Sequence, residues 1–422
     1  MRVCVCKGSA VTALGASPVV CENGLLKDFD AAKKAAFLKA IDYVVDKNPL
    51  LGGRLVALEG RVYVETGTFH KTFCTQVRTP KNLPPMTPTI HKDPRAMLRL
   101  LNTIDDECFP ESPMGADQIQ QNLPLFHVYL VELKHGYAAY SLRMSHYLGD
   151  VATKNLVENQ LWAYMQDELQ QQDGSHSQGK TSKTRVPDID WKEDTMCSVE
   201  EFLEYKTKKH AKNTTLWDRL ASPFAMMWPV IYSLLFPYKR IHEIVLSCDK
   251  IQEAKDRFSK EPEVSSLTTT DIIWAALARS SVNVKLLLTV MNQRGERSGV
   301  FKEQEAGNLM LNRILFGQAA QDPKAVHSSL RMTHEQHFEP GSIPWWPLMT
   351  GNFLVVSSWR NLNQRKLPPW VVCKSVPRTF FTCTPLAEGM VVVHQMDDKH
   401  IVVKHMKRFI DAKNGLLGEL LA

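Results

Sequence analysis

The first clear pattern along the chain is a helical repeat of apolar residues. Phe37, Ile41 and Val44 recur every three or four positions, which predicts a helix over residues 31–46. Asp30 precedes this run, and its carboxylate can accept hydrogen bonds from the unpaired amides of the first turn. We therefore expect a capped helix early in the chain.

A second pattern, strict alternation, occupies the segment from Leu123 to Met165. Alternating large apolar residues predict one strand over 126–130 and another over 138–144. The alternation ends at His146, and a helical pattern begins after Asp150. His146 is therefore expected at a junction between a strand and a helix, where rigid elements can hold a side chain at the edge of a cleft.

The second half of the chain mixes both patterns. It predicts strands at 243–247, 285–291, 391–393 and 401–403 and helices at 249–258 and 270–279. The polar segment Gln170–Lys183, rich in Gly, Ser and Gln, is typical of a linker. We expect an α/β (α+β) protein with a first lobe over 1–169, a linker and crossover over 170–242 and a second lobe over 243–422.

Composition places the chain among ordinary globular proteins. Its 422 residues are 44% hydrophobic and 23% charged, with a net charge of +6. That excess suits weak attraction to an anionic cosubstrate but lacks the clustered basicity of a nucleic-acid binder. The nine cysteines show no C-x-x-C pair and no Cys/His metal spacing, so we expect reduced thiols in a cytoplasmic protein and no metal site.

Two apolar segments, Val3–Val20 and Phe224–Phe236, raise the question of a signal peptide or of membrane contact. Phe224–Phe236 is shorter than the roughly 20 residues that a membrane span needs, and it contains Pro229. It is either a buried helix or a patch that touches a membrane surface or a lipid-like substrate. Trp345 and Trp346 also indicate apolar surface near a site, or core packing. No compact apolar run of the signal-peptide type occurs near the N-terminus.

His146 carries the candidate chemistry. An ordinary histidine titrates near pH 6.5, so its neutral form can accept a proton from a hydroxyl or an amine at neutral pH. Attack on a thioester then needs a positioned acyl donor and hydrogen-bond donors for the oxyanion, but no nucleophilic residue. The spacing of His146 and Asp150 is weak evidence, because His394 and Asp398 share it by chance. From spacing alone, His146 could equally be a structural histidine beside a helix-capping Asp150.

The chain resembles the BAHD-type, coenzyme A-dependent acyltransferases, in the broad form that includes fungal trichothecene-type acetyltransferases. The similar blocks follow the family's order, with H-x-x-x-D in the second: Asn48–Leu55, Leu123–Asp150, Thr269–Arg279, Val290–Asn308 and Val356–Trp359. The resemblance implies two chloramphenicol-acetyltransferase-like lobes with an active-site tunnel between them. It further implies that acyl-CoA enters from one side and the acceptor from the other.

The resemblance also implies roles for individual residues. His146 would be the general base, while Asp150 would brace its loop through Arg294 rather than move protons. Ser357 and Trp359 would lie near the tetrahedral oxyanion. Each of these has an ordinary alternative, namely a solvated loop for Arg294 and strand packing for Ser357 and Trp359.

Three departures from the family pattern concern the base and the cofactor. Ser145 stands where many members carry a second histidine, and Val151 where glycine is usual. The D-F-G-W-G block is replaced by Pro369–Lys374, which lacks the aspartate and both glycines. Because that block lines the cofactor entrance in the family, the coenzyme A contacts are unassigned, with Lys374 as a weak candidate.

The sequence thus predicts transfer of an acyl group from acyl-CoA to a hydroxyl or amine of a small molecule, with no covalent enzyme intermediate. We expect a cytoplasmic monomer of secondary metabolism. Two alternatives stay open. One is a condensation-type enzyme that takes its acyl group from a carrier protein, and the other is an inactive relative that binds a small molecule or a partner. The acceptor and the acyl chain are not specified by the sequence.

Overall fold

The computed structural model describes most of both halves of the chain. The described residues are 2–7, 14, 19–67, 70, 72–80, 82–110, 113–172, 187–192, 241–259, 267–281, 284, 286–292, 294–295, 301–331, 353–360, 367–382, 389–406, 410–413 and 415–422. The expected linker Gln170–Lys183 lies outside them from residue 173 onward, as do Phe224–Phe236 and both Trp345 and Trp346. Among the described residues, no helix is long and apolar enough to cross a membrane.

The chain divides into two compact units, each built around its own sheet. The first comprises Met1–Leu203, Asn292–Met310 and Asn361–Cys383. The second comprises Glu204–Met291, Leu311–Arg360 and Thr384–Ala422.

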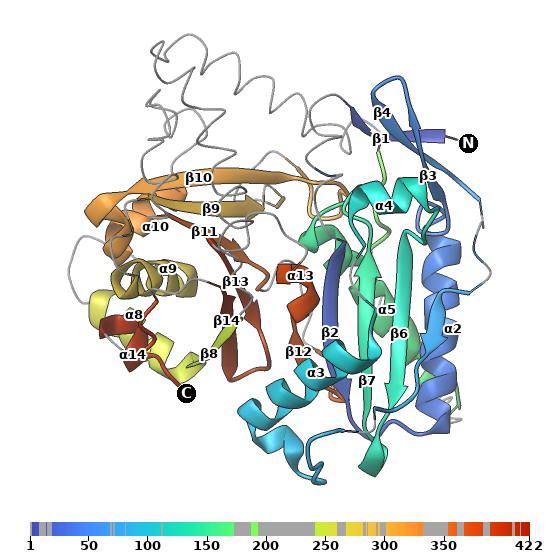
Figure 1. Cartoon of the computed structure of the whole chain (residues 1–422), viewed down its shortest axis with the longest axis horizontal. Coiled ribbons are helices and arrows are strands. Elements are labelled where there is room, and N and C mark those ends of the chain that lie inside the picture. The colour runs from blue at the N-terminus through green and yellow to red at the C-terminus, as the bar shows by residue number, and fades with distance from the viewer. Residues whose placement is uncertain are drawn as a thin grey trace, which may run out of the picture. The chain divides into compact units, whose positions relative to one another are not determined.

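A five-stranded mixed sheet forms the centre of the first unit (Figure 1). Its order is β12 (Val371–Ser375), β2 (Val20–Leu26), β7 (Ala138–Met144), β6 (Phe126–Glu132) and β5 (Cys74–Gln76). All neighbours are antiparallel except β5 and β6. A separate small sheet joins β1 (Arg2–Lys7), β4 (Arg61–Glu65) and β3 (Arg54–Leu58).

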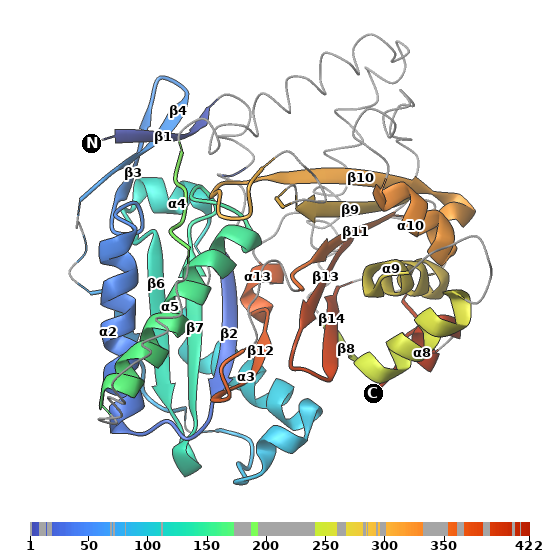
Figure 2. The ribbon, with the colours of Figure 1, turned by 180° about the vertical axis from the view of Figure 1, so that it is seen from behind.

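Helices cover both faces of this sheet. The long helices α2 (Ala31–Lys47) and α5 (Val151–Gln172) pack together on one face, and α3 (Pro94–Cys108) lies on the other (Figures 1 and 2). Short elements complete the unit: η1 (Ile90–Lys92), α4 (Gly115–Gln120), η2 (Lys134–Gly136) and α13 (Arg378–Thr382). The helical repeat and the Asp30 cap are confirmed, since the Asp30 carboxylate accepts a 2.8 Å hydrogen bond from the amide of Lys33.

The alternation along β6 and β7 sorts their side chains between the two faces. Phe126, Val128 and Leu142 belong to the apolar core on the side of α2 and α5. The intervening residues, Tyr129 and Arg143 among them, turn to the other face. His146 follows directly after β7 and α5 begins at Val151, so the expected strand–loop–helix junction is confirmed.

The second unit contains a six-stranded sheet. Its order is β10 (Met310–Phe316), β9 (Leu286–Asn292), β11 (Phe353–Ser358), β13 (Met390–Gln395), β14 (His400–His405) and β8 (His242–Ser247). Its helices are α8 (Cys248–Ser259), α9 (Thr269–Ser280), η3 (Gly317–Gln321), α10 (Pro323–Arg331) and α14 (Gly415–Glu419). The strands and helices expected here are present. Helix α9 begins at Thr269, one residue before the expected start, and Thr268 caps it: the side chains of Thr268 and Asp271 accept hydrogen bonds from each other's amides.

The expected boundary of the second lobe requires a correction. The sequence assigned all of 243–422 to it, but 292–310 and 361–383 belong to the first unit. The physical reason is backbone pairing, because β12 hydrogen-bonds along β2 and completes the edge of the first sheet. Helix α5 also extends to Gln172, three residues beyond the expected end of the first lobe at 169.

Candidate functional site

The loop Ser145–Asp150 between β7 and α5 holds the candidate base in a fixed backbone conformation. The amide of Ser145 donates to the Leu125 carbonyl at 2.7 Å, and the Asn308 side-chain amide donates to the His146 carbonyl at 2.7 Å. The Ser145 hydroxyl bonds to the Gln118 side-chain oxygen at 2.7 Å. The backbone of the loop is therefore anchored at Ser145 and at His146, which fixes the point from which the imidazole projects.

The His146 side chain is half-buried and suited to accept a proton. Its Nδ1 atom is buried and makes no hydrogen bond to any described residue. Burial lowers the pKa of His146, although its own carbonyl, the Asp150 charge and Asn308 act in the opposite direction. A lowered pKa keeps the imidazole neutral at neutral pH, which is the form that can act as a general base.

Asp150 is fully engaged in the scaffold. Its Oδ2 accepts from the Arg294 guanidinium at 2.9 Å and from the Leu309 amide at 3.1 Å. Its Oδ1 accepts from the Thr153 amide at 3.0 Å, at the first turn of α5. A Cβ on the adjacent Gly149 would meet the Thr153 hydroxyl at 2.4 Å, so this close approach favours glycine there. The carboxylate thus ties the loop to the helix.

Arg294 uses every donor of its guanidinium. Nε donates to the Glu305 carbonyl at 2.6 Å, and Nη1 donates to Asp150 and to the Asn292 side chain, both at 2.9 Å. Nη2 donates to the Thr153 hydroxyl at 2.9 Å and to the Gly307 carbonyl at 2.7 Å. The side chains of Arg294 and Asp150 are 0% and 3% exposed, so this is a buried and fully bonded ion pair.

Ser357 and Trp359 come together at the end of β11 in the second unit. The Trp359 indole N–H donates to the Ser357 hydroxyl oxygen at 3.1 Å, and the Trp359 amide donates to the Val393 carbonyl at 2.7 Å. Ser357 is partly exposed whereas Trp359 is buried. Because the indole donates to it, the serine hydroxyl keeps its own hydrogen for another acceptor.

Lys374 does not lie where an anionic cofactor could use its charge. It is 1% exposed, and its ammonium lies 2.7 Å from a Glu158 oxygen and 3.6 Å from a Glu22 oxygen. Lys154 contacts the same two carboxylates. Burial alone would raise the pKa of Glu158, but the charges of Lys154 and Lys374 outweigh it and lower that pKa. The expectation for Lys374 is therefore corrected: it belongs to a buried four-charge cluster.

The Pro369–Lys374 segment, which stands where the D-F-G-W-G block was expected, is part of the first sheet and its core. Trp370 packs against the core of the first unit, and its carbonyl accepts from the Lys27 amide at 2.9 Å. Val371 and Cys373 continue as β12 beside β2. The segment thus forms an edge strand of the first sheet.

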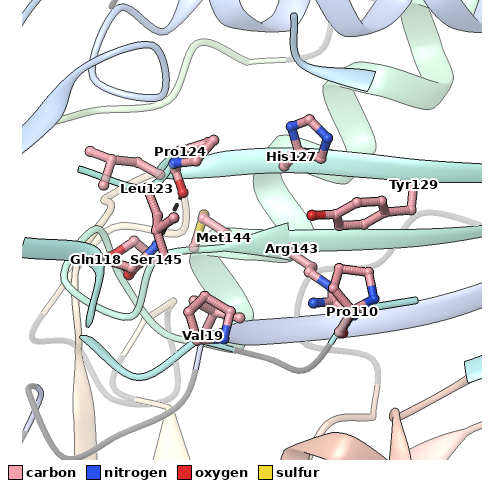
Figure 3. Close-up of a pocket in the computed structure, with 12 residues that line it drawn as sticks. Val19, Pro110, Gln118, Leu123, Pro124, His127, Tyr129, Arg143, Met144 and Ser145 are labelled. Carbon is pink, nitrogen blue, oxygen red and sulfur yellow. Dashed lines mark hydrogen bonds between the residues drawn. The ribbon is translucent and has the colours of Figure 1, made fainter. Parts of the chain in front are cut away.

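A pocket of about 180 Å³ lies beside the His146 loop on the face of the first sheet away from α5 (Figure 3). Its polar lining is Gln118, His127, Tyr129, Arg143 and Ser145, within apolar walls. The Arg143 guanidinium carbon lies 4.9 Å from the centre of the Tyr129 ring. Burial, followed by the charges of Arg143 and His70, lowers the pKa of His127 to about 4. The volume is below the roughly 300–1,000 Å³ of drug-sized ligand sites, so the pocket admits only part of a small molecule.

Sequence reasoning did not identify this pocket. The one clue to the pocket in the sequence was the alternation along β7, which places Arg143 on the face away from the apolar core. The rest of the lining comes from β6, the end of β7 and several segments between Val19 and Leu125, which no local pattern brings together.

Comparison with known proteins identifies the fold. No protein-family model and no curated protein matches the sequence. The structure of F. graminearum TRI101 complexed with ethyl coenzyme A covers 100% of this chain and 99% of its own, with a TM-score of 0.60 at 11% identity. Vinorine synthase covers 99% and 93%, with a TM-score of 0.59 at 10% identity.

A third structure, the first condensation domain of the CDA synthetase, covers 95% of this chain and 90% of its own. Its TM-score is 0.53 at 14% identity. At such low identities these likenesses show the fold. The chloramphenicol-acetyltransferase-like fold that the sequence resemblance implied is therefore confirmed.

Proposed function

We propose that the protein transfers an acyl group from acyl-CoA to a hydroxyl or amine of a small-molecule acceptor, with His146 as the general base. The observation that carries this proposal is a neutral, half-buried imidazole on a braced strand–helix loop. The shared fold supports it, because TRI101 has been crystallised with coenzyme A and with T-2 mycotoxin or deoxynivalenol.

The reaction balances without a covalent enzyme intermediate. His146 accepts the proton of the attacking O–H or N–H as the new bond to the thioester carbonyl carbon forms. The carbon–sulfur bond then breaks, and the imidazolium returns the proton to the departing thiolate. Ser357 donates a hydrogen bond to the carbonyl oxygen while that oxygen carries negative charge, with Trp359 orienting the serine. Asp150 and Arg294 hold the base in place and carry no proton.

A screen of acyl-CoA donors against pooled alcohols and amines tests the proposal, with release of free thiol as the readout. His146→Ala is expected to lower kcat by about two to four orders of magnitude, the usual contribution of a general base. His91 provides a matched control, because it is a half-buried histidine of the same unit that bonds to the Tyr137 hydroxyl. His91→Ala should retain turnover within about threefold. Near-normal turnover in His146→Ala would refute the role.

The condensation-type alternative has one observation in its favour, the likeness to a condensation domain. The corrected position of Lys374 also leaves the coenzyme A contacts unassigned. An acyl group loaded on a carrier protein distinguishes the two functions. Turnover with the loaded carrier and none with free acyl-CoA would favour this alternative, whereas isothermal titration without heat from coenzyme A or the carrier would favour the inactive, ligand-binding relative.

A further inference from the structure

The pocket beside the His146 loop has two chemically different ends (Figure 3). At one end, which we call the arginine end, Arg143 lies beside the Tyr129 ring, and the Tyr129 hydroxyl points into the pocket. The opposite end, which we call the loop end, is lined by Gln118, Leu123, Pro124 and Ser145. A ligand that fills the pocket must therefore match both ends.

The arginine end carries a positive charge in a largely buried setting. Arg143 is 5% exposed, and two of its nitrogen atoms donate to neutral groups, the Pro110 carbonyl at 2.6 Å and the Ser141 hydroxyl at 3.4 Å. None of the described lining residues is an aspartate or a glutamate. The charge of Arg143 also acts, after burial, to lower the pKa of the neighbouring His127. Because His127 is thus neutral at neutral pH, Arg143 supplies the charge of the lining, and that charge favours an anionic group of a ligand.

The loop end offers a ligand an apolar surface. Its polar side chains already bond within the protein, since the Ser145 hydroxyl donates to the Gln118 oxygen at 2.7 Å and the Gln118 amide donates to the Pro124 carbonyl at 3.1 Å. Val19 and Leu123 contribute apolar side chains to the walls. A second charge placed there would lose its hydration without gaining a counter-charge, so this end suits the apolar part of a ligand.

The pocket has room for one substituted ring. Its volume is about 180 Å³, whereas an apolar cavity of about 150 Å³ can hold benzene. Pro110 is exposed, and Tyr129 and Pro124 are partly exposed, so the lining reaches the protein surface and a ligand can enter there. The size and the two ends together fit a compact ring with a carboxylate on one side.

We propose that this pocket binds the acceptor, and that the acceptor is a compact hydroxy- or amino-carboxylic acid whose carboxylate contacts Arg143 and Tyr129. A guanidinium matches the geometry of a carboxylate, and the phenol hydroxyl is a further donor. The ring then extends towards the loop end, where Ser145 directly precedes His146 in the chain. The inference rests on the proposed function and names its substrate class. Arg143 and Tyr129 bind the acceptor and move no proton.

Isothermal titration with the meta and para isomers of hydroxybenzoate and with the matching hydroxybenzamides tests the preference for a carboxylate. Acid and amide differ in charge but little in shape, and the wild type should bind one of the acids at least about tenfold more tightly than its amide. Arg143→Met should weaken binding of that acid about 10–100-fold and change binding of the amide by no more than about threefold. Arg99→Met, on the exposed side of α3, is a matched control that should bind both ligands like the wild type.

Two results would overturn the inference: equal affinity for acid and amide in the wild type, or a preference for the acid that survives Arg143→Met. Tyr129→Phe covers the case in which methionine at the buried position 143 prevents folding. This variant keeps the ring beside Arg143 and removes one donor, so it should weaken binding of the acid by about three- to tenfold. An unchanged affinity in Tyr129→Phe would remove the hydroxyl from the site and, without a folded Arg143→Met, overturn the inference.

Release of free thiol from acyl-CoA in the presence of the same acids separates this inference from the proposed function. Arg143→Met should raise KM for the acid about 10–100-fold and leave kcat within about threefold, because the arginine binds the acceptor without taking part in the chemistry. Turnover with neutral alcohols or amines but with no carboxylic acid would overturn the inference and leave the proposed function intact. Binding of the acid without thiol release from any acyl-CoA would overturn the proposed function and the acceptor role, and would leave the pocket as a carboxylate site.

Discussion

His146 and His394 each stand four residues before an aspartate, yet the structure treats the two segments differently. Asp150 is 2% exposed and bonds to Arg294, Thr153 and the Leu309 amide. Asp398 is exposed in the turn between β13 and β14. At the strand–loop–helix junction the spacing therefore belongs to a loop that Asp150 braces. At the hairpin, His394 is buried and Asp398 is exposed, so the same spacing has no structural meaning.

The comparison shows that the spacing of a histidine and an aspartate does not reveal their roles. The hydrogen bonds that each side chain makes are more informative. The Arg294 guanidinium uses all its donors, which is the behaviour of a structural group. The His146 imidazole instead keeps its buried Nδ1 atom without a bond to any described residue. Together with its place on the braced loop, this makes His146 the group that we assign to the substrate. Three predictions test that division.

The largest effect is expected where the satisfied network is broken. Asp150→Ala leaves the buried Arg294 guanidinium without its counter-charge, which should lower the free energy of unfolding by roughly 3–5 kcal/mol. Asp398→Ala, the matched control from the same spacing, should change it by no more than about 0.5 kcal/mol. Chemical unfolding followed by tryptophan fluorescence measures both.

The activity of the same variants sharpens the comparison. If Asp150 only braces the loop, the folded fraction of Asp150→Ala should lose turnover in step with its loss of stability. An unchanged unfolding midpoint with abolished turnover would show instead that Asp150 takes part in the chemistry.

A second, somewhat smaller effect concerns the four-charge cluster of Glu22, Lys154, Glu158 and Lys374. Lys374→Met leaves two buried carboxylates with one ammonium, so stability should fall by about 3 kcal/mol while KM for acyl-CoA stays unchanged. Lys34→Met removes an exposed pair with Glu132 and should cost at most about 1 kcal/mol. A raised KM at unchanged stability would restore Lys374 as a cofactor residue.

The local elements could be predicted from the sequence because their signals are local. The repeat of Phe37 and Ile41 predicted α2, and the alternation around Tyr140 predicted β7. The pairing of Asp150 with Arg294 came from resemblance, since no spacing rule connects residues so far apart. In the structure the two side chains form a 2.9 Å ion pair.

The features that could not be predicted depend on long-range packing. Lys374 looks like an ordinary surface lysine until β12 pairs with β2 and buries it against Glu22. His394 likewise looks like a coincidental match to a motif. Its complete burial becomes visible only when β11, β13 and β14 are assembled. The burial of a side chain and the hydrogen bonds that it makes are properties of the folded chain, so they cannot be predicted from local sequence patterns.

The smallest predicted effect is a dependence of stability on pH that His394 creates. Its pKa is about 3 in the native protein, whereas an unfolded histidine titrates near 6.5. Between these values the unfolded chain binds a proton that the native protein excludes. The stability is therefore fully present above pH 6.5 and falls by about 1.4 kcal/mol for each pH unit below it.

From pH 7 to pH 5 this single group should lower the free energy of unfolding of the wild type by about 2 kcal/mol. The His394→Leu variant should not show this decrease. Other titrating groups, including His146 with its own lowered pKa, change both proteins alike and cancel in the difference. Urea unfolding of both proteins at the two pH values measures it. Equal losses would mean that His394 can be protonated in the native state.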